Sequence, residues 1–407
     1  MKILLVVANF YPEIGSAAHI YYDLARAFIK NGHEVDVLTS YPRRFNLIEV
    51  DAIKIFPFHE NLEGIQVHRC RHPAKRDNLI LRGMEHFLLQ WYYFRLYKKI
   101  NKKFDICLMY IPPLPFWYLA KKIKGYDGTP SILNFQDFLP QELIDVGLLK
   151  NPIIIKILEH IEKESYKNAD FITVLSEGGV NYIISKGGVP KRIKHIYNGS
   201  FKSNYDNFYI KSDFKRKEGI ENKFLISYAG ILSEMQGVDT ILDVAQSLLN
   251  HKDIIFYIIG DGMLKDKIEL KIENFSINNV KLLPLQPIEE YFDIINSSDI
   301  SIVSLDKRMK APCFPGKIVN LTAMRQPIIA IVPENSETAR IVNTWRFGVV
   351  VKPEDMNNLG AIILKLKKDK ILLEELRNNG RKFFEANMDL DKIVLMYEDI
   401  FTTLIKT

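Results

Sequence analysis

Glycines mark the point where a strand-like run gives way to a helical pattern in the first half of the chain. The loop there is Asn9–Ser16, between the β-branched run Lys2–Ala8 and the pattern Ser16–Lys30. Gly15 and Ser16 would lie at the helix N-terminus, where free backbone N–H groups and the helix dipole favour anions. A plain turn with Ser16 as N-cap is the alternative. The loop lacks the Gly-x-Gly-x-x-Gly fingerprint, which disfavours a dinucleotide site.

The second half carries a similar loop, Tyr228–Gly237, after its own strand-like run. Gly230 permits close approach of a ligand to the backbone directly after the strand, and Gly237 opens the next helical pattern. A further loop, Gly260-Asp261-Gly262, also follows a strand-like run. There a tight turn capped by the aspartate is as well supported as contact with a ligand.

Lys317 begins a helical pattern directly after the stretch Pro312–Gly316. A lysine at a helix N-terminus opposes the helix dipole, so it is locally unfavourable unless it meets an anion. We therefore expect Lys317 to bind a diphosphate, with a solvated lysine as the alternative. Cys313 has no partner histidine nearby in the sequence and is interpreted as a small packing residue.

Strand-like runs alternate with helical patterns from end to end, which predicts an α/β protein with parallel sheets covered on both faces. The series restarts after the turn-rich stretch Asn198–Asn207, so we expect two doubly wound, Rossmann-like domains rather than one barrel. The predicted domains cover residues 1–200 and 201–388. Ligands bind at the carboxyl ends of parallel strands, which places the expected site in a cleft where the two domains face each other.

The expected strands of the first half are Lys2–Ala8, His33–Thr39, Gly64–Cys70, Phe104–Tyr110, Ser131–Gln136, Phe171–Leu175 and Ile193–Tyr197. The expected helices between them are Ser16–Lys30, Leu79–Ile100, Pro152–Lys167 and Gly178–Lys186. In the second half we expect strands at Phe224–Tyr228, Ile254–Ile259, Val280–Leu283, Ile300–Ser304, Pro327–Ile331 and Val349–Val351, alternating with helices up to Leu404.

Composition bounds the class of protein. The chain has 407 residues, of which 47% are hydrophobic and 26% charged, and this excludes long disorder, collagen and coiled coils. No apolar run approaches the ~18 residues of a membrane span, and the first run ends too early for a signal peptide. Three separated cysteines are typical of a reducing cytoplasm.

Basic residues concentrate in segment 69–103, which holds ten of them against two acidic residues, a net charge of +8. Apolar residues recur there at helical spacing, beside several tyrosines: Ile80, Met84, Phe87, Leu88, Trp91 and Phe94, with Tyr92, Tyr93 and Tyr97. This combination predicts a helix lying on an anionic membrane surface. An ordinary amphipathic helix with a solvated basic flank is the alternative, and a nucleic-acid groove is disfavoured because no nucleic-acid motif accompanies the segment.

Taken in order, several stretches resemble glycosyltransferase family 4, of the GT-B fold, and in particular the branch that builds bacterial surface polysaccharides on lipid carriers. They span nearly the whole chain: Tyr11–Gly15, Gly32–Thr39, Gln136–Pro140, Tyr197–Gly199, Tyr228–Gly230 with Gln236-Gly237, Gly260–Gly262, Pro315–Lys317 and Gln326–Ala330. The resemblance implies retaining transfer of a sugar from a nucleotide diphosphate sugar, usually UDP-linked. It also implies that the last helix, in 389–407, crosses back onto the first domain.

Roles follow from the resemblance by position. It implies that Gly15 and Ser16 face the diphosphate, and that Gly230 begins the donor loop. Gly316 and Lys317 meet phosphate oxygens, while the backbone from Leu283 to Leu285 holds the base. It implies no cofactor, only the nucleotide sugar as substrate and UDP as product.

The sequence departs from the family pattern at four positions. The usual pair of glutamates falls on Pro312 and Asn320, and Asn320 is expected to bond ribose hydroxyls more weakly than a carboxylate. The usual Arg and Lys of the donor loop fall on Ile231 and Gln236. Lys317 and backbone amides are then the visible diphosphate ligands.

In the first domain, Asp137 is the best candidate for contact with the acceptor, with a helix cap or turn residue as the alternative, and His19 is a poorer candidate. A retaining reaction needs no separate base, since the leaving phosphate can take the acceptor proton. We predict no metal: the only Asp-x-Asp, Asp389-Leu390-Asp391, is interpreted as a helix cap.

The predicted function is transfer of a sugar to a membrane-associated saccharide, such as one linked to polyprenyl diphosphate, in O-antigen, capsule or related polysaccharide synthesis. The protein would act at the cytoplasmic face of the inner membrane, bound peripherally through segment 69–103. Two alternatives remain open at this point: a nucleotide-sugar epimerase or hydrolase of the same fold, and a non-catalytic membrane-bound subunit.

Overall fold

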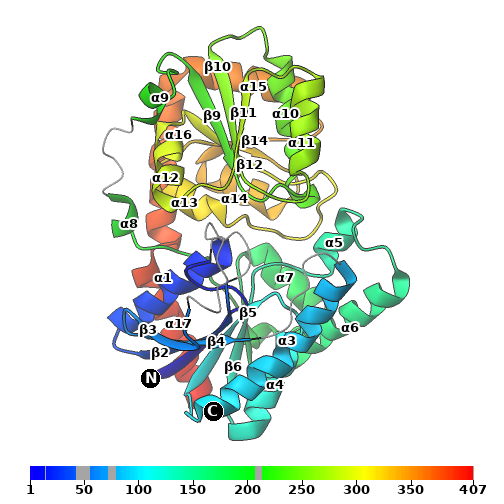
Figure 1. The fold of residues 1–407 in the computed structure, drawn as a ribbon, viewed down its shortest axis with the longest axis vertical. Helices are drawn as coiled ribbons and strands as arrows, with labels where there is room; N and C mark the ends of the chain where they lie inside the picture. Colours follow the sequence, from blue (N-terminus) through cyan, green and yellow to red (C-terminus); the bar gives the residue numbers. More distant parts are fainter. Residues whose placement is uncertain (14, 43–55, 72–78, 207–212, 407) are drawn as a thin grey trace. The chain divides into compact units, whose positions relative to one another are not determined.

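The chain forms two compact units (Figure 1). The computed structural model describes residues 1–13, 15–42, 56–71, 79–206 and 213–406, with the backbone alone for 79–84. The first unit consists of Met1–Pro140, Lys150–Ser200 and Leu390–Thr407, and the second of Gln141–Leu149 and Phe201–Asp389. Segment Gln141–Leu149 thus belongs to the second unit, whereas the sequence analysis placed it in the first domain.

The first unit is built on an eight-stranded sheet of order β3-β4-β2-β1-β5-β6-β7-β8. All its strand pairs are parallel except β3 with β4, which is antiparallel. Only β3, a short and half-exposed edge strand, was not predicted, because its sequence His-Glu-Asn-Leu has no β-branched residue. The strands are β1 (Lys2–Val6), β2 (Glu34–Ser40), β3 (His59–Leu62), β4 (Ile65–Cys70), β5 (Ile106–Ile111), β6 (Ser131–Phe135), β7 (Phe171–Val174) and β8 (Ile193–His195).

Helices cover both faces of this sheet. The crossovers from β4 to β5, β5 to β6 and β6 to β7 all run the same way, so their helices α3, α4 and α6 lie on one face, as Figure 1 shows. The helices of the unit are α1 (Ser16–Lys30), α3 (Leu79–Ile100), α4 (Phe116–Asp127), α6 (Pro152–Asn168), α7 (Glu177–Ser185) and α17 (Leu390–Ile405), with a 3₁₀ turn at Pro190–Arg192. Helix α4 was not predicted, because its aromatic start favours a strand.

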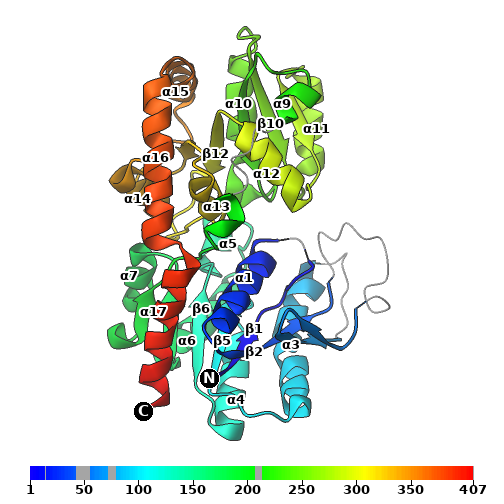
Figure 2. The same cartoon turned by 90° about the vertical axis from the view of Figure 1, so that its left-hand side faces the viewer.

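The last helix, α17, belongs to the first unit and packs against α1 (Figure 2). An ion pair of 2.7 Å joins Lys30 Nζ to Asp391 Oδ1, and His33 Nε2 lies 2.8 Å from Glu398 Oε1. The C-terminal segment therefore completes the layer that α1 begins on this face of the sheet.

The second unit has a six-stranded, fully parallel sheet of order β11-β10-β9-β12-β13-β14. Each of these strands was predicted. They are β9 (Phe224–Ala229), β10 (Ile254–Ile259), β11 (Val280–Leu283), β12 (Ile300–Ser304), β13 (Ile328–Ile331) and β14 (Gly348–Val351). Both units are α/β and doubly wound, which confirms the predicted fold class.

The helices of the second unit lie between and after these strands. They are α5 (Gln141–Asp145), α8 (Ser203–Asp206), α9 (Phe214–Lys217), α10 (Val238–Ser247), α11 (Lys265–Asn274), α12 (Ile288–Ser297), α13 (Lys317–Ala323), α14 (Glu337–Trp345), α15 (Met356–Lys368) and α16 (Lys370–Asn387), with a 3₁₀ turn at Glu234–Gln236. Among the residues described, no helix is both apolar and long enough to cross a bilayer.

Candidate functional site

The order of the strands reverses once in each sheet, and this locates the candidate site. In the second unit the chain runs outward from β9 to β11 and then returns to place β12 on the other side of β9. The loops after β9 and β12 therefore flank a switch point, where ligands bind in parallel sheets. In the first unit the corresponding loops follow β1 and β5. Two predicted residues, Gly230 and Lys317, come from the loop after β9 and from the helix that follows β12.

Glycines let two loops of the second unit pack backbone against backbone. A Cβ on Gly260 would lie 2.0 Å from the carbonyl oxygen of Gly230, and one on Gly262 would lie 2.3 Å from that of Leu232. The amide of Gly230 donates to Ile259 O at 2.9 Å. The amide of Gly262 donates to its neighbour's carboxylate, Asp261 Oδ1, at 2.8 Å. The loop after β10 is thus a capped turn that supports the loop after β9.

The loop after β9 is also fastened to the end of β12. Ser304 Oγ donates to Gln236 O at 2.6 Å, and the amide of Asp306 donates to Met235 O at 2.9 Å. Gly237 has a φ of 57°, in the left-handed region, and a Cβ there would meet Leu305 O at 3.2 Å. Both sides of the switch point are therefore held rigidly by their own backbones.

The side chain of Lys317 points toward the end of β9 and the loop that follows it. Its Nζ lies 4.0 Å from the centroid of the Tyr228 ring and 3.3 Å from Gln236 Oε1. A Cβ on Gly230 would come within 2.8 Å of the same Nζ, so a larger residue there would push the end of the lysine aside. Burial lowers the pKa of Lys317 to about 7. Among the residues that the structure describes, the ammonium contacts a ring face and an amide oxygen but pairs with no carboxylate, an arrangement suited to an incoming anion.

Asn320 lies one turn beyond Lys317 on α13. Its Oδ1 accepts a hydrogen bond of 2.7 Å from the hydroxyl of Tyr205. Tyr291 also hydrogen-bonds to Asn320, although burial still raises the pKa of Tyr291 to about 12. Two tyrosines therefore fix the amide, at the position where the family usually has a glutamate.

The remaining predicted residues of the second unit lie at element ends. Leu283 ends β11, and its carbonyl oxygen accepts from the amide of Gly260 at 3.0 Å. Leu285 follows in the loop and is half-buried. Gly316 is the N-cap of α13, directly before Lys317, and no side chain caps that helix.

A segment that the sequence analysis did not single out supports the loop before Lys317. Asp145 Oδ2 accepts from the amides of Lys310 at 2.7 Å and Ala311 at 2.9 Å. Glu142 is 5% exposed, and its Oε1 accepts from Cys313 Sγ at 3.3 Å. A buried carboxylate therefore lies beside the residue that follows Pro312, the position of the family's first glutamate. Nothing local in the sequence connects residues so far apart.

In the first unit, the loop after β1 leads into α1 with Gly15, not Ser16, as N-cap, and no side chain caps the helix. Ser16 is exposed as the first helical residue. His19 is half-buried one turn later, and burial lowers its pKa, partly offset by the charge of Asp23. Ser200 Oγ donates to Asp23 Oδ2 at 2.7 Å, which fixes that carboxylate.

Asp137 is exposed two residues after β6. The residue before it, Gln136, is buried and forms a reciprocal amide pair with Asn198, with N···O distances of 3.0 and 2.6 Å. This pair joins two stretches that carry the family resemblance and fixes the backbone from which Asp137 projects. Because only β5 separates β1 from β6, the Gly15 loop and Asp137 follow strands about 10 Å apart at the same sheet edge. The predicted site residues thus belong to both units. The first unit holds Gly15, Ser16, His19 and Asp137, and the second unit holds the remaining six.

Part of the predicted membrane segment is wrong. Arg69 is completely buried on β4, paired with Glu60 and donating to Tyr11 O at 3.1 Å. Its Nε and Nη1 have no hydrogen-bond partner among the residues described. Lys102 is engaged by Asp36 at 2.5 Å. Arg69 was missed as a residue of the carboxyl edge because its basic neighbours in sequence suggested a surface patch.

Helix α3 exposes part of the predicted apolar stripe and buries two of the tyrosines beside it. It buries Tyr93 and Tyr97, so these tyrosines are not at an interface, and it exposes Phe87, Leu88 and Trp91. Lys122 of α4 lies over the Trp91 ring, 3.1 Å from its centroid. The exposed basic residues that remain are Arg71, Arg95, Lys98, Lys99 and Lys103. Lys75 and Arg76 lie outside the described residues, as do the side chains of Ile80, Arg82 and Met84.

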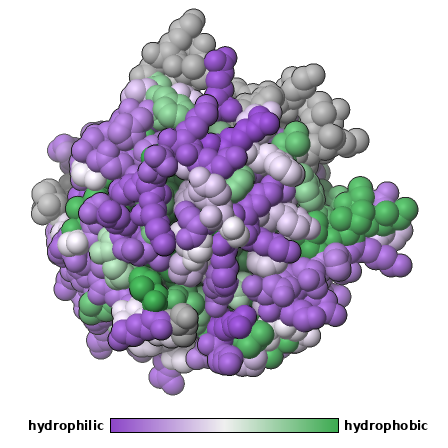
Figure 3. Space-filling view, turned by 90° about the horizontal axis from the view of Figure 1, so that it is seen from below, coloured by the Kyte–Doolittle hydropathy of each residue, from purple (hydrophilic) through white to green (hydrophobic). Residues whose placement is uncertain are grey.

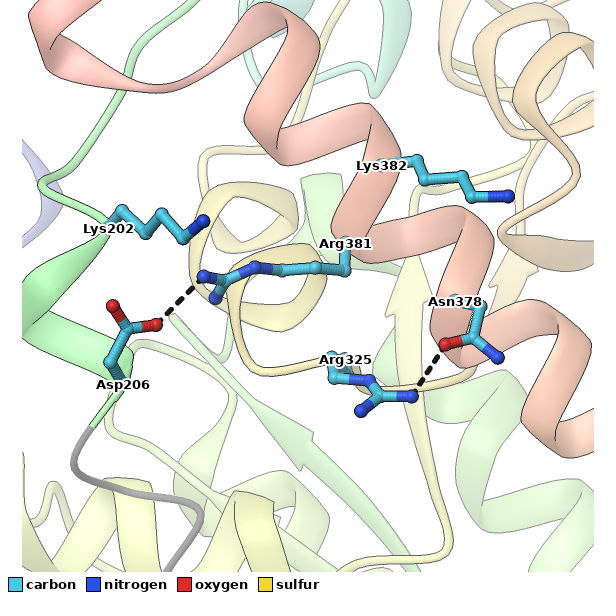
Figure 4. A pocket seen from close by; sticks show the side chains of 6 residues that line it. All are labelled: Lys202, Asp206, Arg325, Asn378, Arg381 and Lys382. Carbon is cyan, nitrogen blue, oxygen red and sulfur yellow. Dashed lines mark hydrogen bonds and ion pairs between the residues drawn. The ribbon is translucent and has the colours of Figure 1, made fainter.

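A separate pocket of about 420 Å³ lies between α8 and α16 of the second unit (Figure 4). Its charges are largely matched: Arg381 meets Asp206 at 2.9 Å and Glu385 at 2.9 Å, and Arg325 meets Glu374 at 2.7 Å. We interpret these ion pairs as contacts that fix α8 to α16. The pocket is lined by Lys202, Asp206, Arg325, Asn378, Arg381 and Lys382. Across the described residues, no group of three or more His, Cys, Asp or Glu is placed to hold a metal.

Two family models match the chain, one in each half. Residues 15–199 match the glycosyl transferase 4-like domain, and residues 210–383 match glycosyl transferases group 1. Together they include every site residue that was predicted from the sequence.

Individual proteins agree with the family models. The putative colanic acid biosynthesis glycosyl transferase WcaI of Escherichia coli K12 is 21% identical over 98% of both chains. Anabaena HepE, solved with UDP-glucose, has a TM-score of 0.73 at 14% identity and 99–100% coverage. WaaG, a glycosyltransferase of lipopolysaccharide biosynthesis, has a TM-score of 0.66 at 14% identity, with coverage of 98% of this chain and 99% of WaaG. The chain is thus a glycosyltransferase of the GT-B fold, in which a glycosyl transferase 4-like domain is followed by a glycosyl transferases group 1 domain.

Proposed function

We propose that this glycosyltransferase transfers a sugar, with retention of configuration, from a UDP-linked donor to a saccharide carried on a polyprenyl diphosphate. The transfer would take place at the cytoplasmic face of the inner membrane, in surface polysaccharide synthesis. The similarity to WcaI supports the polysaccharide assignment, and the likeness to HepE supports a UDP-linked donor. No metal is required in this proposal.

The observation that carries the proposal is the placement of Lys317 against Gly230 at the switch point of the second unit. A diphosphate there would receive the Lys317 ammonium and the backbone amides of the donor loop. Because charge develops on the leaving diphosphate in the transition state, a fixed cation stabilises that state more than the bound donor. The bound anion also raises the pKa of Lys317 again, since an opposite charge favours the ammonium.

The base and ribose would lie along neighbouring strand ends. Leu283 ends β11, and its carbonyl oxygen accepts from Gly260 in the loop after β10. Leu285 lies in the loop that follows β11. Asn320 Oδ1 accepts from Tyr205, and the amide N–H that does not engage Tyr291 would bond a ribose hydroxyl. Gly316 places the start of α13, and therefore Lys317, at the diphosphate.

The first unit would supply the acceptor side. Asp137 is exposed at the carboxyl edge and would accept a hydrogen bond from the acceptor hydroxyl. His19, with its lowered pKa, is neutral near pH 7 and would orient the acceptor without adding charge. Gly15 and Ser16 would offer amide donors at the start of α1. In a retaining reaction the acceptor proton passes to the leaving phosphate oxygen, so neither side chain needs to act as a strong base.

Membrane contact would use the exposed basic residues of α3 and its end: Arg95, Lys98, Lys99 and Lys103. Each contributes about 1 kcal/mol near an anionic surface. We expect the protein to bind anionic vesicles at ~50 mM salt and less at ~500 mM. Changing these four residues to Glu should abolish binding without altering UDP affinity. Lys102 is left in place because it pairs with Asp36.

Release of UDP tests the proposal as a whole. We expect release that depends on both a UDP-sugar and a lipid-linked acceptor, and that is lost in the Lys317→Ala variant. Retention is read from the anomeric configuration of the product by NMR. Equal release without any acceptor would instead indicate a hydrolase. No turnover with any donor, despite donor binding, would indicate a non-catalytic subunit.

A further inference from the structure

The start of helix α6 exposes three isoleucines. Ile153, Ile154 and Ile157 are 68%, 46% and 52% exposed. The helix start itself is well formed: Asn151 is the N-cap, its side chain accepts from the amides of Ile153 and Ile154, and Pro152 occupies the first turn. The isoleucines are therefore held outward by a regular helix.

This exposure is not matched by the rest of α6. Further along, the same helix buries Ile161, Glu162, Ser165 and Tyr166 in the ordinary way. Lone exposed apolar residues are normal, but clustered ones mark a contact surface. Figure 3 shows a large hydrophobic area on the side of the molecule where Figure 1 places α6.

The charges of segment 150–158, which contains the isoleucines, are all positive. Lys150 and Lys156 are exposed beside them, and no acidic residue occurs from Lys150 to Leu158. This segment thus combines exposed apolar side chains with cations, which is the composition that anionic bilayers attract.

The position of the cluster in the fold adds an independent argument. Helices α3 and α6 cover the same face of the sheet, and each begins at the carboxyl edge because it follows a parallel strand. Phe87, Leu88 and Trp91, in the middle of α3, are exposed as well. The isoleucines at the start of α6 therefore lie toward the edge where Asp137 would meet the acceptor.

We propose that the start of α6, with Ile153, Ile154 and Ile157, inserts into the headgroup region of an anionic phospholipid bilayer and brings the carboxyl edge of the first unit to the membrane. This deepens the proposed function and rests on it for the lipid-linked acceptor. The basic residues of α3 supply long-range attraction, and the isoleucines supply the insertion that resists salt.

A second copy of the chain is a poorer occupant. Three isoleucines fall well short of the roughly 800 Å² per partner that stable interfaces bury. A symmetric contact would also bring Lys150 and Lys156 of both copies together, and like charges repel. An anionic surface removes that repulsion and turns it into attraction.

Vesicle co-sedimentation of the full chain tests the proposal, with Ile153, Ile154 and Ile157 all changed to Ser. Against vesicles with about 30% anionic lipid, we expect the affinity of this variant to fall by about tenfold or more, because three apolar side chains no longer leave water. The matched control changes Leu270, Ile371 and Leu395, exposed apolar residues on other helices, to Ser and should bind as the wild type does.

A second measurement locates the insertion. Tryptophan placed at Ile154 should shift its fluorescence to the blue on vesicle addition and be quenched by brominated acyl chains. Unchanged binding by the isoleucine variant, or a tryptophan at this position that stays in water, would overturn the proposal. A wild type that does not bind anionic vesicles would overturn it too. So would an isoleucine variant whose only change is the loss of a dimer in sedimentation velocity.

The same samples separate this inference from the proposed function. If the isoleucine variant binds vesicles normally while the wild type releases UDP with a lipid-linked acceptor, the insertion fails and the proposed function stands. If vesicle binding depends on the isoleucines but no acceptor supports UDP release, the insertion stands and the proposed function fails.

Discussion

The two units hold their candidate residues in opposite ways. In the second unit, Lys317 and Gly230 are enclosed by loops that pack backbone against backbone, and the single cation is partly desolvated. In the first unit, Asp137 is exposed at a sheet edge, and apolar and basic side chains project from the helices nearby. The difference supports the proposal that the second unit binds a small ligand through fixed geometry and that the first presents a surface to a larger and more variable partner.

The largest effect should come from the glycine contact that makes the second unit rigid. Gly260→Ala places a Cβ 2.0 Å from the backbone oxygen of Gly230, which cannot move without breaking the loop. We expect destabilisation of about 3 kcal/mol in urea unfolding and loss of donor binding. As a control, Gly125→Ala in α4 meets no atom within 4 Å and should stabilise the protein by up to ~1 kcal/mol. Equal stability of the two variants would contradict the account.

Lys317→Ala should separate binding from folding in the same unit. A charge-assisted phosphate contact contributes ~1.5–3 kcal/mol, so UDP affinity should fall by roughly tenfold to a hundredfold. The melting temperature should not fall, because the variant removes a lysine that burial already disfavours. Calorimetric titration with UDP measures the first quantity and thermal unfolding the second. Unchanged UDP affinity would remove Lys317 from the site.

Asp137→Asn probes the other side of the comparison. We expect kcat/KM for the lipid-linked acceptor to fall by about tenfold, the value of a strong hydrogen bond, while UDP affinity stays constant. Glu177→Gln is the matched control, because Glu177 is an exposed carboxylate that opens α7 at the same sheet edge. An Asp137→Asn variant with normal acceptor kinetics would assign acceptor contact elsewhere.

The affinity of the second unit for the donor should depend on pH. Because the pKa of Lys317 is about 7 and a bound diphosphate requires the ammonium, the Kd for a UDP-sugar should be flat below about pH 7 and rise by up to tenfold per pH unit above it. A UDP-sugar is the appropriate probe, since its diphosphate does not titrate in this range. Calorimetry near pH 8 in two buffers of different ionisation enthalpy should reveal proton uptake. Lys317→Ala should abolish that uptake; a wild type without it would refute the linkage.

The smallest expected effect concerns the ribose. Asn320→Ala should raise the donor Kd by roughly fivefold, the value of a neutral hydrogen bond, whereas Asn320→Glu should be tolerated or bind more tightly. Tyr205→Phe distinguishes positioning from contact, because it removes only the hydroxyl that holds Asn320 Oδ1. A structure with UDP in which Asn320 lies more than ~3.5 Å from both ribose hydroxyls would exclude the role.

Local chemistry made much of this architecture predictable. Strand-like runs predicted every strand of the second sheet, and the glycines of 230–262 and the helix-opening Lys317 could be found because each signal occupies a few consecutive residues. Prediction failed where the deciding contact joins residues that are far apart in the sequence. Glu142 meets Cys313, and Gln136 meets Asn198, through folding alone. Arg69 resembled a surface cation because its sequence neighbours are basic, although its strand is central enough to bury it.

Segment Gln141–Leu149 has a consequence for how the protein can be divided. A fragment that starts at residue 201 would lack the carboxylate that satisfies the amides of Lys310 and Ala311, and one that ends at residue 200 would lack α17 and leave α1 uncovered. Neither unit is therefore contiguous in the gene. A chimera that exchanges the second unit between relatives would therefore have to include the nine residues 141–149 together with residues 201–389.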